Sequence, residues 1–236
     1  MTQPTLVLIP GLLCDYASWS TIPGRLAARL PVSMADITRQ DSIPAMAQDI
    51  LDRLSGDLLV AGHSLGGRVA FEMWRLAPER IGGLAVLDTG ITAYKQGEEK
   101  IRARRVALAH EKGMRALADD WLPPFVHPAR HVDLALMGSL AAMVERMTPE
   151  IHERQIKALL SRPDAGPVLP TITCPALVAT GSHDKWSPPA DHEAMAASMA
   201  DARLVTFEEA GHFTITEQPD SVASEMEGWI DRCLAT

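Results

Sequence analysis

The stretch VAGHSLGGRVAFEMW, residues 60–74, places a serine among glycines, between an apolar run and a helical pattern. Gly62, Ser64 and Gly66 match the spacing G-x-S-x-G, and the strand before and helix after are the context that this motif requires. The pattern predicts a sharp turn that projects the Ser64 hydroxyl from the end of a sheet. The alternative is a tight glycine turn whose serine only caps the helix. A phosphate loop is disfavoured, because the spacing G-x-x-x-x-G-K-S/T is absent.

The same alternation of apolar runs and helical patterns continues outward from this stretch. Runs that predict strands lie at residues 5–10, 32–37, 58–62, 83–88, 176–181 and 203–208. Patterns that predict helices lie at residues 44–55, 65–77, 190–199 and 218–233. Near-continuous apolar runs are typical of parallel strands that are buried on both faces. The chain is therefore predicted to be an α/β protein with a mostly parallel, twisted sheet flanked by helices.

The alternation breaks between residues 91 and 170, where the periodicity is helical and no convincing strand occurs. Residues 98–122 predict two amphipathic helices that are broken near Gly113, and two more helical segments follow. An insertion between parallel strands is most simply a lid over the carboxyl edge of the sheet, where open α/β sheets bind ligands. We expect residues 1–90 and 171–236 to form the core domain and residues 91–170 to form a helical cap.

Composition narrows the possible partners and compartments. The chain has 236 residues and a net charge of −8, and its densest basic segment, Arg102–Arg105, fits the polar face of a helix. We therefore expect no nucleic-acid partner. The apolar N-terminal run is expected to be a strand rather than a signal peptide, and no run is long enough to span a membrane. Three widely spaced cysteines, with no CxxC pair, favour reduced thiols and a cytoplasmic location.

A serine nucleophile needs a base and a group that orients the base. His212 follows the last predicted strand, and Asp184 follows the strand before it, so both are expected at the carboxyl edge with Ser64. Asp88, which also ends a strand, is the rival carboxylate. His127 and His131 are four residues apart, but Pro128 stands where a zinc protease helix has glutamate, so no metal is expected.

The chemistry also needs donors for a developing oxyanion. The backbone N–H of Leu65, directly after the serine, is one candidate, and the N–H of Leu12, after the first long strand, is the other.

Four segments together resemble the signature blocks of the α/β-hydrolase superfamily: IPGLLCDYASW, AGHSLGG, GSHDKWSPP and AGHFTITEQP. They are most similar to those of the small lidded carboxylesterases, lactonases and carbon–carbon bond hydrolases, across nearly the whole chain. The resemblance implies an α/β-hydrolase fold with the triad Ser64, Asp184 and His212. Pro10-Gly11 stands where family members commonly have His-Gly, and a glycine-rich loop often found after the second long strand is missing.

The expected function is hydrolysis of a small or medium, largely apolar carboxylic ester or lactone through an acyl-enzyme, without metal or organic cofactor. A carbon–carbon bond hydrolase with the same triad and a non-catalytic binding module on the same fold remain alternatives. An apolar lid gives little reason to expect a charged substrate. Whether the protein is a monomer or a homodimer is not distinguishable from the sequence. The expected substrate-lining residues are Trp19, Trp121, Met137, Met143, Trp186 and Phe213.

Overall fold

The computed structural model describes residues 3–235. At its centre is a six-stranded sheet in the order β2-β1-β3-β4-β5-β6, in which every neighbouring pair is parallel. The strands are β1 (Thr5–Ile9), β2 (Val32–Met34), β3 (Leu58–His63), β4 (Ile81–Leu87), β5 (Ala176–Gly181) and β6 (Ala202–Phe207). Each corresponds to a predicted strand, so the predicted fold class is confirmed. The edge strand β2 is shorter than predicted and pairs with β1 only from Val32 to Met34.

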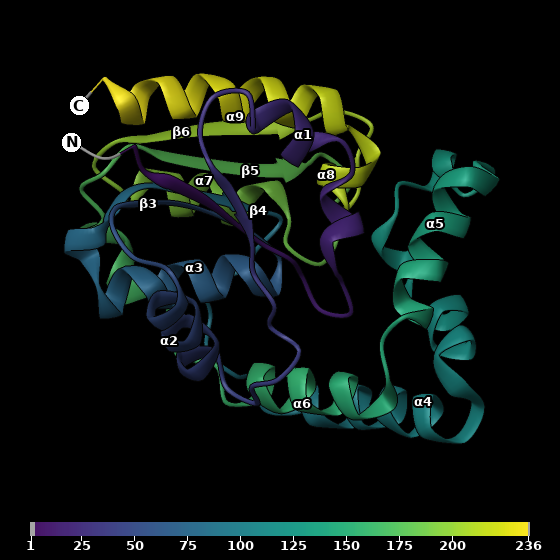
Figure 1. Ribbon diagram of the computed structural model, residues 1–236. Helices are drawn as coiled ribbons and strands as arrows, with labels where there is room; N and C mark the ends of the chain where they lie inside the picture. Colours follow the sequence, from purple (N-terminus) through teal and green to yellow (C-terminus); the bar gives the residue numbers. More distant parts are fainter. Residues whose placement is uncertain (1–2, 236) are drawn as a thin grey trace.

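Helices cover both faces of this sheet, with α1 and α9 on one side and α2 and α3 on the other (Figure 1). The helices of the core are α1 (Ile22–Leu26), α2 (Ile43–Arg53), α3 (Leu65–Leu76), α7 (Pro189–Ala197), α8 (Thr214–Glu217) and α9 (Pro219–Leu234). Ser42 caps α2, because its hydroxyl accepts from the N–H of Ala45. Within residues 3–235, no helix combines the length and apolarity that crossing a bilayer requires.

The two faces of the sheet bury alternate residues of the same strands. Val7 and Val60 pack with α2 and α3, whereas Leu6, Leu8 and Leu59 pack with α1 and α9. Successive side chains of a strand point to opposite faces, so a strand covered on both sides must be apolar throughout. This explains why the strands appear in the sequence as continuous rather than alternating apolar runs.

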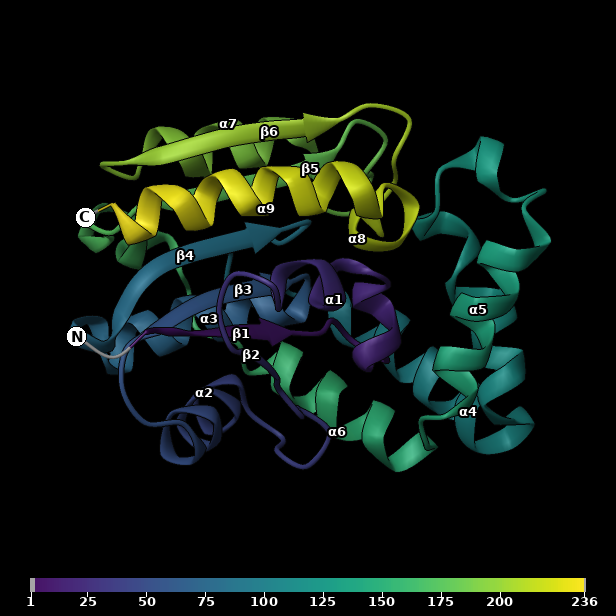
Figure 2. The ribbon, with the colours of Figure 1, turned by 45° about the horizontal axis from the view of Figure 1, so that its top comes forward.

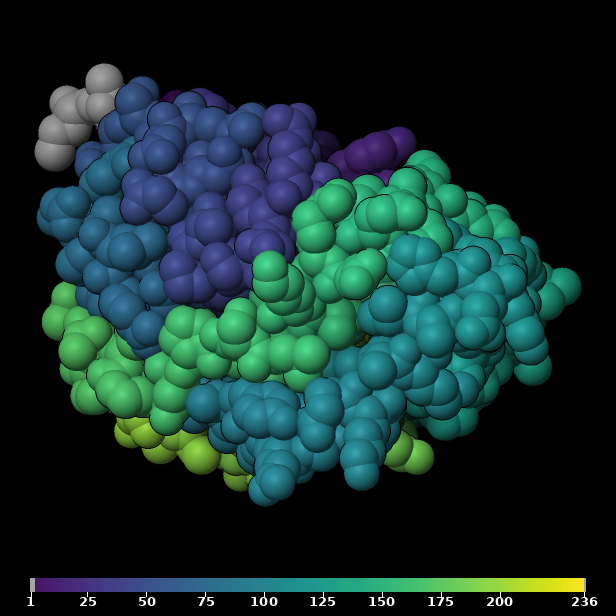
Figure 3. Space-filling model, turned by 90° about the horizontal axis from the view of Figure 1, so that it is seen from below, coloured from purple at the N-terminus to yellow at the C-terminus, as the bar shows by residue number. Residues whose placement is uncertain are grey.

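The segment between β4 and β5 is helical and lies beyond the ends of the strands. Figure 2 shows the arrowheads of the sheet pointing toward it. It contains α4 (Glu98–Trp121), α5 (Leu134–Glu145) and α6 (Pro149–Leu160), with short 3-10 helices at Pro123–Phe125, Pro128–Arg130 and Gly166–Thr171. Gly113 interrupts α4 with φ 83° and ψ 172°, so the break predicted there is confirmed. In the space-filling view from below, the green α6 lies between the teal α4 and the blue and purple N-terminal part of the core (Figure 3).

Side-chain hydrogen bonds fix α6 to the loop that follows β2. The Gln155 amide donates to the carbonyl of Ile37 at 3.3 Å, and its oxygen accepts from the N–H of Leu13 at 2.9 Å. Arg154 donates to the carbonyl of Thr38 at 3.2 Å. Through its bond to Leu13, Gln155 joins the helical segment to the turn that follows β1. Gln155 is fully buried, so both of its hydrogen bonds are shielded from water.

Candidate active site

Ser64 lies in a strained turn between β3 and α3. Its φ of 52° and ψ of −113° are rarely adopted by a residue with a side chain. The turn is possible because backbones approach closely around it: a Cβ on Gly62 would lie 2.2 Å from the carbonyl oxygen of Gly66, and a Cβ on Gly66 would lie 2.2 Å from that of Ile9. The Thr89 hydroxyl donates to the carbonyl of Ser64 at 2.6 Å and braces the turn.

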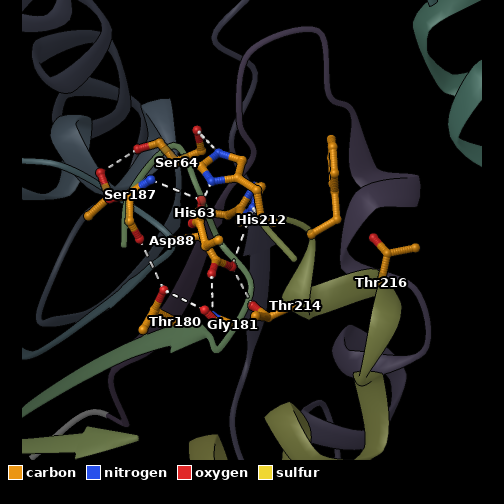
Figure 4. Close-up of polar contacts among 12 residues, drawn as sticks. His63, Ser64, Asp88, Thr180, Gly181, Ser187, His212, Thr214 and Thr216 are labelled. Carbon is orange, nitrogen blue, oxygen red and sulfur yellow. Dashed lines mark hydrogen bonds and ion pairs between the residues drawn. The ribbon is translucent and has the colours of Figure 1, made fainter. Parts of the chain in front are cut away.

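The structure brings Ser64, His212 and Asp184 into one hydrogen-bonded line. Ser64 Oγ lies 2.8 Å from Nε2 of His212, and Nδ1 of the same ring lies 2.7 Å from Oδ2 of Asp184 (Ser64 and His212 are labelled in Figure 4). The geometry fits a serine that donates to Nε2 while Nδ1–H donates to the carboxylate. This is the arrangement in which a histidine can take a proton from serine and remain oriented.

Asp184 is fixed as an ionised acceptor by the turn after β5. Its second oxygen accepts from the N–H of Trp186 at 2.8 Å and from that of Ser187 at 2.9 Å. Burial raises the pKa of Asp184, but the charge of His212, its hydrogen bond and the two backbone donors outweigh burial, and the pKa ends below its usual value. The carboxylate is therefore ionised at neutral pH.

The loop that carries His212 is held from below by Glu217 and from above by the helical segment. Glu217 accepts from the N–H groups of Gly211 at 2.9 Å and His127 at 2.9 Å. The N–H of His212 donates to the carbonyl of Phe125 at 2.6 Å. Because Phe125 and His127 belong to the segment between β4 and β5, that segment positions the histidine loop directly.

Asp88, the rival carboxylate, lies close to the hydrogen-bonded line of Ser64, His212 and Asp184, but its own hydrogen bonds go to other residues. It accepts from the N–H of Gly181 at 3.1 Å and shares a short hydrogen bond with the Thr214 hydroxyl (Figure 4). Burial and the neighbouring Asp184 raise its pKa well above the usual value. Through these two contacts Asp88 supports the loops after β5 and β6.

His63 lies beside Asp88 and His212, and no role for it was predicted from the sequence. Its Nε2 lies 2.7 Å from the carbonyl of His212 and 3.6 Å from Asp88. Burial, followed by the charge of His212, lowers the pKa of His63 to about 3, so the ring is neutral and its contact with Asp88 is not an ion pair. The N–H donated to His212 O makes His63 a second positioning group for the histidine loop.

The two predicted oxyanion donors belong to different elements that line the cavity of Ser64. Leu65 is the first residue of α3, and Leu12 lies in the turn after β1; both line the same cavity as Ser64. Among the described residues, no acceptor is bonded to either N–H. Both predicted donors are therefore available to an oxygen bound beside Ser64.

A cavity of about 460 Å³ opens above Ser64, between the sheet edge and the helical segment. Of the six residues expected to line it, Trp121, Trp186 and Phe213 do so. Trp19, Met137 and Met143 do not, and that part of the prediction is wrong. Trp19 is packed beneath α9, against the opposite face of the sheet, and the two methionines belong to the apolar core of the helical segment itself.

The walls of the cavity are more strongly charged than the sequence suggested. Arg102 and Arg105, expected on the solvated face of a helix, turn inward, with only 11% and 16% of their side chains exposed. The Arg102 guanidinium lies 5.9 Å from the centre of the Trp186 ring. Arg68 of α3 and Arg162 after α6 also line the cavity.

The sequence alone could have placed one of these arginines, Arg68, at the cavity, but not Arg102 or Arg105. Arg68 follows Ser64 by four residues, one turn of helix, so it had to lie near the same edge. Arg102 and Arg105 are three residues apart and share a helix face, but only the packing of α4 decides that this face is turned inward.

Comparison with known proteins shows the family to which the chain belongs. Residues 6–225 match the model of the alpha/beta hydrolase family. The chain belongs to this family. A pimeloyl-acyl-carrier protein methyl ester esterase of Aromatoleum aromaticum is 25% identical over 246 residues, which cover 96% of this chain and 98% of the relative. An esterase of the same name from Stenotrophomonas maltophilia is 27% identical over 248 residues, covering 96% and 93%.

Solved structures give the same result. A thermophilic esterase from Thermogutta terrifontis, with malate bound, has a TM-score of 0.90 and 25% identity, covering 98% of this chain and 91% of that one. The enol-lactonase of Burkholderia xenovorans LB400 has a TM-score of 0.87 at 22% identity, covering 98% and 92%, and shares the fold. Within the family, the chain is a carboxylic ester hydrolase.

Proposed function

We propose that the protein hydrolyses a small or medium carboxylic ester or lactone through a covalent acyl-enzyme on Ser64. The observation that carries this proposal is the line of hydrogen bonds from Ser64 through His212 to Asp184, at 2.8 Å and 2.7 Å, on the floor of the cavity. A free serine hydroxyl is a weak nucleophile at neutral pH, and this line supplies the base that it needs.

In the first step, His212 Nε2 takes the proton of Ser64 as Oγ attacks the carbonyl carbon. The ionised Asp184 holds Nδ1–H and stabilises the imidazolium that forms. The same Nε2–H then protonates the leaving alcohol, and the ester bond breaks. In the second step, His212 takes a proton from water, the resulting nucleophile attacks the acyl carbon, and Ser64 regains its proton as the acid departs.

The N–H groups of Leu12 and Leu65 supply the oxyanion hole in this proposal. Neither N–H is bonded to another acceptor in the described part of the chain, so both can donate to the oxygen that becomes negative during attack. Preorganised donors of this kind contribute a large part of the rate acceleration in acyl transfer.

Residues 91–170 act as the cap of this site, over a core formed by residues 1–90 and 171–236. Trp121 and Phe125 line the roof of the cavity, and the bond from His212 N to Phe125 O couples the cap to the histidine loop. A cover over the site excludes bulk water, which strengthens the electrostatic interactions beneath it.

The test is ester turnover by wild type, Ser64→Ala and the exposed control Ser198→Ala. The substrates are p-nitrophenyl acetate, p-nitrophenyl butyrate and methyl butyrate; the methyl ester is included because the curated relatives are named for methyl esters. We expect kcat to fall by roughly 10⁴-fold or more in Ser64→Ala and to be unchanged in Ser198→Ala. Stopped-flow traces should show a burst of nitrophenol of one per active site.

A covalent probe makes the outcome independent of substrate choice. A fluorophosphonate should add one group to wild type and to Ser198→Ala, seen as a single mass increment, and none to Ser64→Ala. Equal labelling of wild type and Ser64→Ala would refute the role of Ser64. Turnover that survives in Ser64→Ala would do the same.

A further inference from the structure

The cavity above Ser64 is rich in cationic side chains, although the whole chain has a net charge of −8. Its acidic lining residues are Asp88, Glu98 and Asp191, of which Asp88 has a raised pKa. Its cationic lining residues are Arg68, Lys95, Arg102, Arg105, Arg162 and Lys185. A cleft lined by one sign of charge concentrates ligands of the opposite sign.

Most of these arginines already have a carboxylate partner. Arg162 binds Glu98 at 2.5 Å, and Arg102 binds the same carboxylate at 3.1 Å. Arg105 binds Asp120 at 3.1 Å. One carboxylate is therefore shared between two guanidinium groups, which leaves the wall of the cavity with an excess of positive charge.

Arg68 differs because no carboxylate among the described residues lies within ion-pair distance of it. Its guanidinium donates to the carbonyl of Thr92 at 3.0 Å and packs against Gly90, where a Cβ would come within 3.0 Å of Nη2. Burial, followed by the charges of Arg162 and Arg102, lowers the pKa of Arg68 to about 9, so the group remains protonated at neutral pH. Arg68 is partly buried, and a cation that loses part of its hydration without an anionic partner costs free energy that a ligand anion would offset.

Polar atoms without partners lie around the same wall. Arg102 Nε, His152 Nδ1 and Ser187 Oγ are buried and have no hydrogen-bond partner among the described residues, and all three residues line the cavity. Buried polar atoms are normally paired, so three unpaired ones in residues that line one cavity indicate that it is built for a polar ligand.

We infer that Arg68, together with Arg102, binds an anionic group of the substrate, so that the preferred ester carries a carboxylate or phosphate group away from the bond that is cleaved. The inference rests on the proposed function and corrects the expectation of an uncharged substrate. Arg68 lies one helical turn after Ser64 and fixes the anion while the ester carbonyl lies against Ser64 Oγ. A planar guanidinium can bind either oxyanion through two parallel hydrogen bonds.

The test compares esters that differ only in charge. Monomethyl glutarate is paired with methyl 4-carbamoylbutanoate for an anion on the acyl side, and 3-acetoxypropanoate with 3-acetoxypropanamide for one on the alcohol side. In at least one pair, we expect wild-type kcat/KM to be about 10- to 100-fold higher for the anionic ester, since hydrogen bonds to charged groups contribute this much. Ratios near one in both pairs, with turnover intact, would overturn the inference and leave the esterase proposal standing.

Variants assign the preference to Arg68. Arg68→Gln should bring the ratio to about one, Arg68→Lys should restore part of it, and the exposed control Arg115→Gln should keep the wild-type ratio. A ratio that Arg68→Gln leaves unchanged would overturn the assignment. Because a ratio of two substrates is measured on the same protein sample, partial loss of folded enzyme does not affect it.

Equilibrium binding separates this inference from the catalytic proposal. Titration calorimetry of Ser64→Ala with glutarate and with inorganic phosphate should show binding of at least one, and Arg68→Gln in that background should abolish it. Tighter binding of glutarate indicates a carboxylate substrate, and tighter binding of phosphate indicates a phosphorylated one. Should wild type cleave no ester, binding to Ser64→Ala would still support the anion site, and absence of both would overturn both proposals.

Discussion

Asp184 and Asp88 are buried carboxyl groups that lie beside His212 and His63, respectively. Their electrostatic surroundings are opposite. Asp184 faces the ring of His212 and two backbone N–H donors, which hold its pKa below the usual value despite burial. Among the described residues no cation is paired with Asp88, and burial and the charge of Asp184 raise its pKa. The pKa values of the two carboxyl groups are therefore shifted in opposite directions, which favours Asp184 as the group that stabilises a charged imidazole.

Substitution of each aspartate by asparagine tests this difference. Asp184→Asn should lower kcat for ester hydrolysis by roughly 10⁴-fold, because the amide cannot hold His212 in the required tautomer. Asp88→Asn should lower it by less than about 10-fold, since asparagine resembles the protonated acid and can still accept from Gly181 N. Steady-state kinetics on p-nitrophenyl butyrate measure both, and a larger loss in Asp88→Asn would make Asp88 the orienting acid.

The raised pKa of Asp88 also predicts how stability depends on pH. Above about pH 4 the unfolded chain releases this proton while the folded chain keeps it, so the folded state binds more protons and the contribution of Asp88 to stability falls as pH rises. Asp88→Asn removes this loss. Between pH 4.5 and pH 8 the free energy of unfolding of the variant should rise relative to that of wild type, measured by urea denaturation. A difference that is constant with pH would contradict the raised pKa.

At the scale of elements, the turn between β3 and α3 depends on backbones that touch. A Cβ on Gly66 would lie 2.2 Å from the carbonyl oxygen of Ile9 and 2.6 Å from that of Pro10, so α3 begins against the end of β1. The turn after β1 carries the N–H of Leu12. The same approach therefore positions the nucleophile and the proposed oxyanion donor together.

Gly66→Ala should be both less stable and less active. The added methyl group meets backbone on two sides, which we expect to cost about 3 kcal/mol in free energy of unfolding and to displace the Leu12 N–H. Gly228→Ala is the matched control, because Gly228 lies inside α9 with no atom within 4 Å of an added Cβ. It should gain about 0.5–1 kcal/mol. Chemical denaturation and kcat of both variants decide the matter, and equal effects would show that the contact at Gly66 is relaxed without cost.

At the scale of the whole molecule, Arg162 closes the base of the helical segment. It binds Glu98 at the start of α4 and donates to the carbonyls of Thr92 at 2.9 Å, Ala93 at 2.9 Å and Leu159 at 2.8 Å. Only 4% of its side chain is exposed. The chain leaving the sheet after β4 and the end of α6 are thereby held together at one buried cation.

Arg162→Met should loosen this connection. Loss of the cation removes this donor from the carbonyls of Ala93 and Leu159 and leaves Glu98 with one guanidinium partner fewer, and we expect a cost of about 3 kcal/mol in stability. Trypsin should then cleave after the exposed Lys95 several-fold faster than in wild type, as peptide mapping by mass spectrometry would show. Arg104→Met removes an exposed ion pair with Asp120 and should change stability by less than about 1 kcal/mol. Equal cleavage rates in the two variants would contradict this role for Arg162.

The sequence by itself determined the elements, their order and the turn at Ser64. These depend on short-range physics: continuous apolar runs for strands buried on both faces, Pro44 and Ser42 at the start of α2, and glycines where backbones meet. The order of Ser64, Asp184 and His212 was accessible for the same reason, because parallel strands all end at one edge of the sheet.

Only the tertiary structure decided which side chains face the cavity. Trp19 and Trp186 are equally plausible lining residues in the sequence, but one is packed under α9 and the other faces Arg102. The inward turn of Arg102 and Arg105, and the absence of a carboxylate beside Arg68 among the described residues, depend on how α4 and α6 pack over the sheet. Contacts between segments far apart in the chain produce no periodic pattern in the sequence. The charge of the cavity depends on such contacts, so it could not be predicted from the sequence.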